Sequence, residues 1–161
     1  VDIRGGSMMY YIQHKSGGRN VTENVKNLAI YEKKLRLDDV VTYKIFSKKI
    51  QKNKTQLVEL LTDLKRKGGK IIGYGASGRG TIISNYCGLS NLIEYVVDDE
   101  SAKQGSLMPG THHKIFPSSK MINDKTDYAV LFAWPFFKEI KTKNLHYKGK
   151  FIVPLPQVKI I

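Results

Sequence analysis

Three glycines near the middle of the chain have the spacing of a phosphate-binding turn. Gly73, Gly75 and Gly78 fit the pattern G-x-G-x-x-G, between the β-branched pair Ile71-Ile72 and the helix-like run 81–87. In such a strand–turn–helix unit the first glycine permits a tight turn and the second lets a ligand approach the backbone. The third lets the helix pack on the strand. The residues that this turn would offer to a ligand are Gly73, Tyr74, Gly75, Ser77, Gly78 and Arg79.

The helix after the turn would supply the attraction for the ligand. Its first N–H groups have no partner within the helix and carry a partial positive charge, so they favour a diphosphate. The alternative is a glycine-rich turn that serves the fold and binds nothing.

An acidic residue follows the next apolar run of the sequence. Residues 92–97 have the composition of a strand, and Asp98 comes directly after them, 20 residues beyond Gly78. Dinucleotide-binding folds place at about that distance a carboxylate that bonds a ribose hydroxyl. Asp98 is therefore a candidate ligand contact.

Two further side chains are candidates because of their place after predicted strands. His112 and His113 follow Pro109-Gly110-Thr111 in a loop after the second strand, and loops over such sheets carry function. We expect His112 near the ligand edge of the sheet. Trp134 ends a later strand and could stack on a base or sugar, although core packing is the default for an aromatic side chain.

Several other chemistries find no support in the residue pattern. The four histidines and the single cysteine, Cys87, have no metal-ligand spacing, so we expect no metal site in this chain. Cys87 lies among helix residues and is expected to be a small buried hydrophobe. The chain has neither a G-x-S-x-G elbow nor a G-K-[ST] phosphate loop, which argues against hydrolase and NTPase chemistry.

The elements that would position these residues alternate between strand and helix. Strands are predicted at 70–74, 92–97, 127–132 and 150–154, and helices at about 79–87, 118–123 and 135–144. Alternating units with near-continuous apolar strands indicate an α/β fold, a Rossmann-like, doubly wound and largely parallel sheet. Ligands of such sheets bind beyond the carboxyl ends of the strands, where the strand order reverses.

The residues before this core predict a strand and a long helical segment. Met8–His14 is rich in strand formers, and Asn20 with Glu23 would cap a helix that runs to about Leu35. A second helix begins at Asp38-Asp39 and ends at Gly68-Gly69. It carries one apolar stripe: Val41, Ile45, Ile50, Leu57, Leu61 and Leu64. We therefore expect residues 1–69 to be an N-terminal strand plus a helical arm of the same domain, and 70–161 its nucleotide-binding core.

Composition limits the class of protein and its partners. The 161 residues carry a formal net charge of +13, but the excess is mostly lysine spread over helices, so we expect no nucleic-acid partner. No apolar run approaches the ~20 residues needed to cross a bilayer, and no signal peptide is visible. The single cysteine fits a reducing compartment, so we expect a cytoplasmic location and no membrane partner.

Seven short motifs in order resemble the C-terminal domain of sugar C-methyltransferases, which are S-adenosylmethionine-dependent enzymes acting on nucleotide-linked keto-deoxysugars. The motifs are Gly73-Tyr74-Gly75-Ala76, Gly78-Arg79-Gly80, Asn85-Tyr86-Cys87-Gly88, Tyr95-Val96-Val97-Asp98, Lys103-Gln104-Gly105, Pro109-Gly110-Thr111-His112 and Phe151-Ile152-Val153-Pro154-Leu155-Pro156. Gly5-Gly6-Ser7 resembles the element that opens that domain, so the resemblance covers nearly the whole chain.

This resemblance implies a role in holding the nucleotide-linked sugar, with Asn85 among the contacts. In the family, an N-terminal zinc-binding region and a central domain that binds S-adenosylmethionine precede this domain. The cofactor would therefore be bound by those parts of the same polypeptide, with none in this segment. We expect the segment to belong to an enzyme and to be inactive alone.

One position departs from the family pattern. Better-known members carry a histidine just before the Gly-Gly-Ser element, proposed as the base that removes the sugar C3 proton, and Arg4 stands there in this sequence. An arginine stays protonated in proteins, so Arg4 cannot be that base. Stabilising an enolate or holding a diphosphate are the roles open to it.

Two other functions remain open from the sequence. A free-standing NAD-binding Rossmann domain would use Asp98 for the adenosine ribose. A non-catalytic interaction module would use the lysine-rich helices. The favoured interpretation is the nucleotide-sugar-binding domain of a sugar methyltransferase.

Overall fold

The computed structural model describes residues 7–161, in a chain that forms two compact units, residues 1–50 and residues 51–161. Among the described residues, no helix combines the length and the apolar composition needed to cross a membrane. Arg4, proposed from the resemblance to stand at the position of the catalytic base, lies outside the described residues.

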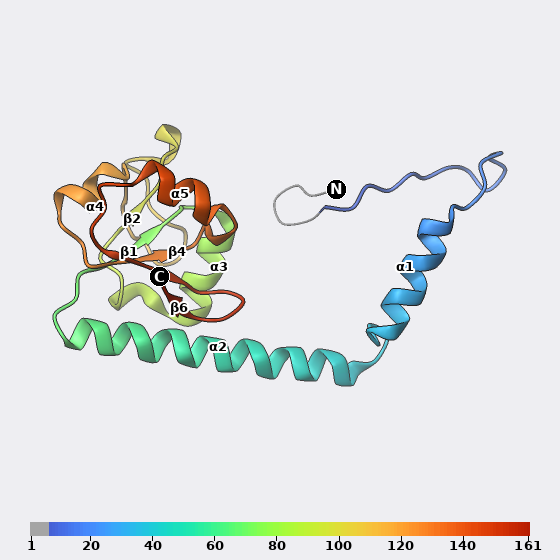
Figure 1. The fold of residues 1–161 in the computed structure, drawn as a ribbon, viewed down its shortest axis with the longest axis horizontal. Coiled ribbons are helices and arrows are strands. Elements are labelled where there is room, and N and C mark those ends of the chain that lie inside the picture. The colour runs from blue at the N-terminus through green and yellow to red at the C-terminus, as the bar shows by residue number, and fades with distance from the viewer. Residues whose placement is uncertain (1–6) are drawn as a thin grey trace. The chain divides into compact units, whose positions relative to one another are not determined.

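A six-stranded sheet organises the unit 51–161 (Figure 1). Its order is β3-β2-β1-β4-β5-β6; the first five strands are parallel and β6 pairs antiparallel with β5. The strands are β1 (Ile71–Tyr74), β2 (Val96–Val97), β3 (Ile115–Phe116), β4 (Tyr128–Leu131), β5 (Lys150–Val153) and β6 (Lys159–Ile160). The expected α/β, Rossmann-like, largely parallel sheet is confirmed.

Helices cover both faces of this sheet. They are the second part of α2 (Val40–Arg66), with α3 (Gly78–Cys87), α4 (Ser119–Asn123) and α5 (Phe137–Lys143). Successive strand residues point to opposite faces, so Ile71 packs with the side chains of α2 and α3, and Ile72 with those of α4 and α5. The result is a three-layer unit whose core is the apolar side chains of the strands.

The order of the strands reverses between β1 and β4. After β1 the chain enters α3 on one face, and after β4 it passes through a short 3₁₀ turn (Trp134–Phe136) into α5 on the other face. The loops that leave β1 and β4 therefore part in opposite directions at the carboxyl edge. Folds of this kind bind ligands at such a point.

Two glycines allow the turn after β1 to pack against the end of β4. A Cβ added to Gly73 would lie 2.6 Å from a ring carbon of Phe132. A Cβ added to Gly80 would lie 2.8 Å from the carbonyl oxygen of Gly75 and 3.0 Å from Cβ of Phe132. Around Gly78 the space is open. The expectation that Gly78 permits helix–strand packing is therefore wrong, because Gly80 has that role.

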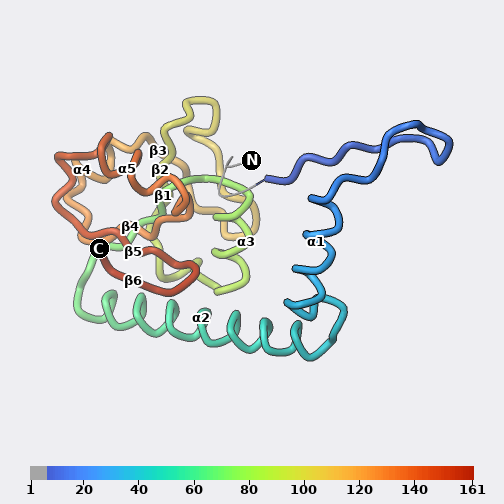
Figure 2. The backbone as a smooth tube through the Cα atoms, turned by 45° about the vertical axis from the view of Figure 1, so that its right-hand side comes forward, coloured from blue at the N-terminus to red at the C-terminus, as the bar shows by residue number. Residues whose placement is uncertain are grey.

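The second part of α2 covers one face of the sheet, as its apolar stripe predicts. Leu57, Leu61 and Leu64 are buried there, whereas Val41 and Ile45 at the start of the helix are exposed. In Figure 2 the segment from β5 to β6 lies beside this part of α2, and the amide of Asn53 donates to the carbonyl of Pro154 at 2.7 Å. The stripe predicted along the whole helix is buried only in its second part.

The first unit differs from the sequence prediction in two places. The structure forms no strand over Met8–His14. The first helix, α1 (Glu23–Lys34), has Thr22 rather than Asn20 at its N-cap, and no residue of α1 is buried. The second helix begins as expected, where Asp39 accepts a 2.8 Å hydrogen bond from the backbone N–H of Val41.

Some elements of the core were also missed or misplaced at the sequence level. The strands β3 and β6 have two residues each, too few to give an alternating pattern. The predicted strand 92–97 is reduced to β2, because residues 89–91 form a 3₁₀ turn whose bonds extend to Leu92 and Ile93. The predicted helix 135–144 is divided into the 3₁₀ turn at Trp134–Phe136 and α5.

We expect Gly80→Ala to lower the stability of the chain by about 1–3 kcal/mol, because the new Cβ meets backbone and Phe132 atoms that are fixed by the core. Gly78→Ala is the matched control in the same helix turn. It has open space around it, so its effect should stay within about 0.5 kcal/mol. Thermal unfolding of the two variants measures the difference. Equal melting temperatures would show that the close contact at Gly80 is not a constraint.

Candidate functional site

The loops that leave β1, β2 and β4 meet at the carboxyl edge of the sheet. The turn 75–79 follows β1, Asp98 and Asp99 follow β2, and Trp134 follows β4. The parallel register of these three strands, with Gly73 opposite both Val96 and Val130, places their ends at the same level. The structure therefore brings together most of the residues that the sequence singled out.

Most N–H groups of the glycine turn are already bonded to protein. The N–H of Gly75 donates to the carbonyl of Val97 at 2.8 Å, and that of Ser77 to the carbonyl of Gly75 at 2.9 Å. The N–H of Ala76 donates to a carboxylate oxygen of Asp98 at 2.7 Å. The turn is thus held closed by its own neighbours, and these three donors are not available to a ligand.

Two donors remain at the start of α3. The hydroxyl of Ser77 caps the helix by accepting from the N–H of Gly80 at 3.2 Å. Within residues 7–161, no acceptor is bonded to the N–H of Gly78 or Arg79. Gly78 is exposed, with open space where a Cβ would lie, and Arg79 is partly exposed. Unbonded N–H groups at a helix N-terminus are donors of the kind that favour an anion.

Gly75 has a structural requirement that the sequence did not reveal. Its φ is +101°, and a Cβ there would lie 2.8 Å from Cβ of Ala133. Its own N–H is bonded within the fold. A side chain at Gly75 would therefore strain the backbone and collide with Ala133 whether or not a ligand is present.

Asp98 is used inside the fold. Only 9% of its surface is exposed, and one carboxylate oxygen accepts from Ala76 while the other accepts from the N–H of Glu100 at 2.9 Å. The ammonium of Lys103 lies 3.5 Å from the same carboxylate. Lys103 is held charged, since its hydrogen bond to Glu100 and the nearby carboxylates raise its pKa. Asp98 thus fastens the loop after β2 to the glycine turn.

Arg79 and Trp134 form a contact across the reversal in strand order. The guanidinium of Arg79 lies 5.4 Å from the ring centre of Trp134 and 5.9 Å from that of Phe136. Both rings belong to the turn after β4, and Arg79 belongs to the first turn of α3. Stacking on the rings fixes the direction of the guanidinium without using its hydrogen-bond donors. The cation of Arg79 is thus held against the turn after β4.

The side chain of Tyr74 joins a polar cluster on the opposite face of the sheet from α3. Its hydroxyl donates to the carboxylate of Asp99 at 3.0 Å and accepts from the amide of Asn144 at 3.1 Å. Burial, and then the charge of Asp99, raise the pKa of Tyr74 to about 12. Asp99 and Asn144 were missed in the sequence. Asp99 could have been found from its place at a strand end, whereas Asn144 carried no signal.

Two predicted contacts lie away from this edge. Asn85, near the end of α3, donates to the carbonyl of Pro109 at 2.9 Å and thereby fixes the loop that carries His112. The ring of His113 lies 3.0 Å from the carbonyl of Ile93, just before β2. Because the loop 99–114 returns to the amino ends of the strands before β3, the expectation that His112 lies near the ligand edge is wrong.

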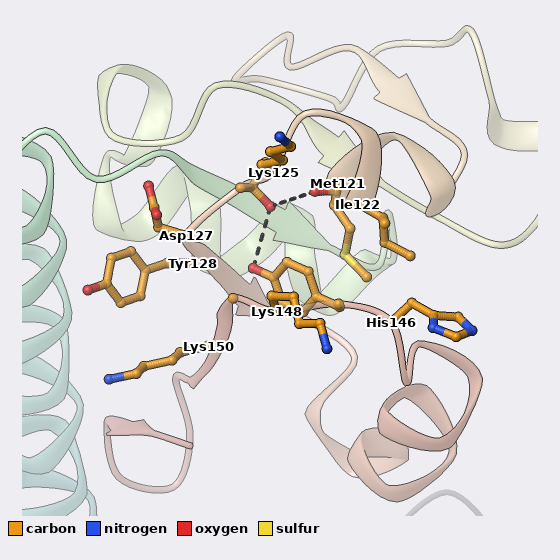
Figure 3. Close-up of a pocket in the computed structure, with 11 residues that line it drawn as sticks. Met121, Ile122, Lys125, Asp127, Tyr128, His146, Lys148 and Lys150 are labelled. Atoms are coloured by element: carbon orange, nitrogen blue, oxygen red, sulfur yellow. Dashed lines mark hydrogen bonds between the residues drawn. The ribbon is translucent and has the colours of Figure 1, made fainter.

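A basic cavity also lies at the amino edge of the sheet, before β4 and β5 (Figure 3). It has a volume of about 490 Å³, and its charged lining residues are Lys125, Asp127, Lys148 and Lys150, with His146 beside them. Inside, the hydroxyl of Thr126 lies 3.2 Å from the carbonyl of Met121 and 3.4 Å from the hydroxyl of Tyr147. This cavity is separate from the glycine turn, which is at the carboxyl edge.

No metal site was found in the part of the chain that the structure describes. Within residues 7–161 there is no group of three or more His, Cys, Asp or Glu side chains that could hold an ion. The charged groups of the carboxyl edge are instead paired with one another or stacked on aromatic rings.

Comparison with known proteins identifies what the chain resembles. Residues 2–156 match the family model described as the C-methyltransferase C-terminal domain. The chain is 27% identical over 164 residues to the C-methyltransferase NovU of Streptomyces niveus. That match covers 99% of this chain and 39% of NovU. The chain therefore spans less than half the length of this curated relative.

The tyrosines of the core predict a loss of stability at high pH. Burial raises the pKa of Tyr74 and of Tyr147 to about 12, against 10.0 for an unperturbed tyrosine. Between pH 10 and 12 these tyrosines lose their hydroxyl protons in the unfolded chain but keep them in the folded chain. Their contribution to stability is therefore fully present below pH 10 and is lost as the pH rises towards 12. Tyr74→Phe should make the fall shallower and cost about 1 kcal/mol at pH 7 through its lost hydrogen bonds. Urea midpoints between pH 7 and 11.5 measure both effects, and parallel curves for parent and variant would contradict the assignment.

Proposed function

We propose that this chain, which belongs to the C-methyltransferase C-terminal domain family, holds a nucleotide-linked sugar. It would do so as one part of a larger sugar methyltransferase. The ligand would bind at the carboxyl edge, with its diphosphate at the N-terminus of α3. The single observation that carries this proposal is the first turn of α3, where the N–H groups of Gly78 and Arg79 have no acceptor within residues 7–161 and the Arg79 guanidinium stacks on Trp134.

The arrangement of charge supports a diphosphate as the bound group. The first turn of α3 carries two N–H donors and the Arg79 side chain, and the helix dipole adds a partial positive charge at that end of the helix. The nearest carboxylate, Asp98, is bonded to Ala76 and Glu100 and paired with Lys103, so its charge is largely compensated. The exposed part of Trp134 offers a flat surface for the sugar or base.

The hydrogen bonds that Asp98 accepts within the fold also bear on the alternative that the chain binds NAD. A dinucleotide site needs a carboxylate after β2 that accepts from the adenosine ribose. Here both oxygens of Asp98 accept from backbone N–H groups of the fold. This disfavours NAD and supports a ligand that needs no such acceptor at that position.

The methyl donor would be bound outside this chain. Within residues 7–161, the one glycine-rich turn between a strand and a helix is the one after β1, and it is assigned to the sugar nucleotide. S-adenosylmethionine would therefore bind to another part of the same polypeptide, alongside a zinc-binding region, in a cytoplasmic enzyme acting on a keto-deoxysugar nucleotide. Arg4 would contribute as a fixed positive charge, at an enolate or at the diphosphate, since it cannot accept a proton.

Calorimetry on the purified chain tests the ligand. We expect dTDP- or UDP-linked sugars to bind more tightly than NAD(H). Arg79→Ala should weaken this binding about 10-fold or more, because a charge-assisted contact to the diphosphate contributes ~1.5–3 kcal/mol.

The matched control is Lys148→Ala, which removes the same charge from the cavity at the amino edge. It should leave the affinity within about 2-fold at physiological salt, where charges more than a Debye length of about 8 Å apart are screened. Equal weakening by both variants would show that binding follows net charge and not the site. Tighter binding of NAD(H) than of any sugar nucleotide would overturn the proposal.

The chain by itself should transfer no methyl group. We expect no release of S-adenosylhomocysteine when the 161-residue chain is incubated with S-adenosylmethionine and a keto-deoxysugar nucleotide, because the donor site would lie elsewhere. Chromatographic detection of the product measures this. Turnover by the purified chain above a no-protein control would place the donor site within these residues.

A further inference from the structure

The side chains of an apolar stretch near the start of the described chain are not packed in any core. The residues Met8, Met9, Tyr10, Tyr11 and Ile12 follow one another without a polar interruption, and their exposed fractions rise from 51% at Met8 to 92% at Ile12. Strand formers predominate in this stretch, yet the structure forms no strand there. Five consecutive large apolar side chains in water are unusual for a folded protein.

The backbone of this stretch is equally unpaired. Among residues 7–161, no backbone hydrogen bond involves Met8–Ile12. Residues 13–19 form a loop held by hydrogen bonds within it. The side chain of Gln13 bonds to both the N–H and the carbonyl of Arg19, and the N–H of Gly17 donates to the carbonyl of His14. The stretch is therefore an extended segment that ends at a self-contained loop.

Its composition fits an inner strand of a sheet. In an extended chain Met8, Tyr10 and Ile12 would point to one side, and Met9 and Tyr11 to the other. A strand that is apolar on both sides belongs in a sheet that is covered on both faces, as in α/β folds. An edge strand facing water on one side would alternate apolar and polar residues instead.

The described sheet offers no suitable place for this strand. Its two edges are β3 and β6, which have two residues each. A ladder with five residues needs a longer partner. The strands long enough to pair with it, β1, β4 and β5, already have a neighbour on each side.

The comparisons leave room for a partner strand outside this chain. The family model begins at residue 2, so this stretch is part of the family domain and not an added tail. The match to NovU covers 99% of this chain but only 39% of NovU, so the relative contains further polypeptide with which such a strand could pair.

We infer that residues 8–12 form an inner strand of a sheet in the methyl-donor part of the same enzyme. The strand would be covered on both faces by apolar side chains of that part, and it would join the donor part to the sugar-binding unit through α1 and α2. The inference rests on the proposed function only in locating the donor part outside this chain.

Hydrogen–deuterium exchange tests this assignment. The 161-residue chain is compared with the polypeptide extended by the coding sequence upstream of Val1. In the short chain we expect the amides of residues 8–12 to exchange at the rate of an unstructured peptide. In the extended polypeptide they should be protected by about 100-fold or more, as in a stable sheet.

Tyr10→Asp and Leu145→Asp form a matched pair, since the two side chains are 72% and 73% exposed. In the extended polypeptide Tyr10→Asp should abolish the protection of residues 8–12, and Leu145→Asp should leave it unchanged. In the short chain neither variant should change the melting temperature, which shows that both fold.

Three results would overturn the inference: fast exchange of residues 8–12 in the extended polypeptide, slow exchange in the short chain, or protection that survives Tyr10→Asp. None depends on sugar-nucleotide binding. Failure of the strand assignment is therefore distinguishable from failure of the proposed function, which calorimetry on the short chain measures.

Discussion

The close approach of the glycine turn to the end of β4 is the constraint on which the site depends. Gly73 and Gly80 lie against Phe132, and Gly75 lies against Ala133, at distances that leave no room for a Cβ. This contact draws the start of α3 towards the turn after β4, which is why Arg79 can stack on Trp134 and Phe136. The glycines thus shape the candidate site by letting the turn after β1 pack against the turn after β4.

A second consequence of the closed turn is a separation of structural and binding roles among neighbouring residues. Asp98 and the N–H groups of Gly75, Ala76 and Ser77 are bonded to one another or to β2, and they hold the turn rigid. The next two N–H groups along the chain, those of Gly78 and Arg79, have no acceptor within residues 7–161. A rigid support with a few unpaired donors aimed at one region is the arrangement that favours tight and specific anion binding, since the donors need no reorganisation.

The two units of the chain bury their apolar side chains to different degrees. Residues 51–161 bury the side chains of a three-layer α/β unit, with helices on both faces of the sheet. Within residues 7–50 no large apolar side chain is fully buried, and only Leu28 and Ile50 are partly buried. Such a difference within one family domain is what a domain taken from a larger assembly would show. The exposed stretch at residues 8–12, inferred above to pair with the methyl-donor part, is the most apolar part of this first unit.

The sequence by itself determined the fold class, the place of the glycine turn and the family, because these depend on local patterns. Glycine spacing, apolar runs and helix periodicity act over a few residues and can be recognised without knowing what packs on them. Only the tertiary structure decided which glycine is a packing glycine, what Asp98 bonds, and at which edge His112 lies. Asp98 meets Ala76 across 22 positions of sequence, and His113 meets Ile93 across 20. Contacts at such separations depend on how strands and loops are ordered in space, which no local pattern encodes.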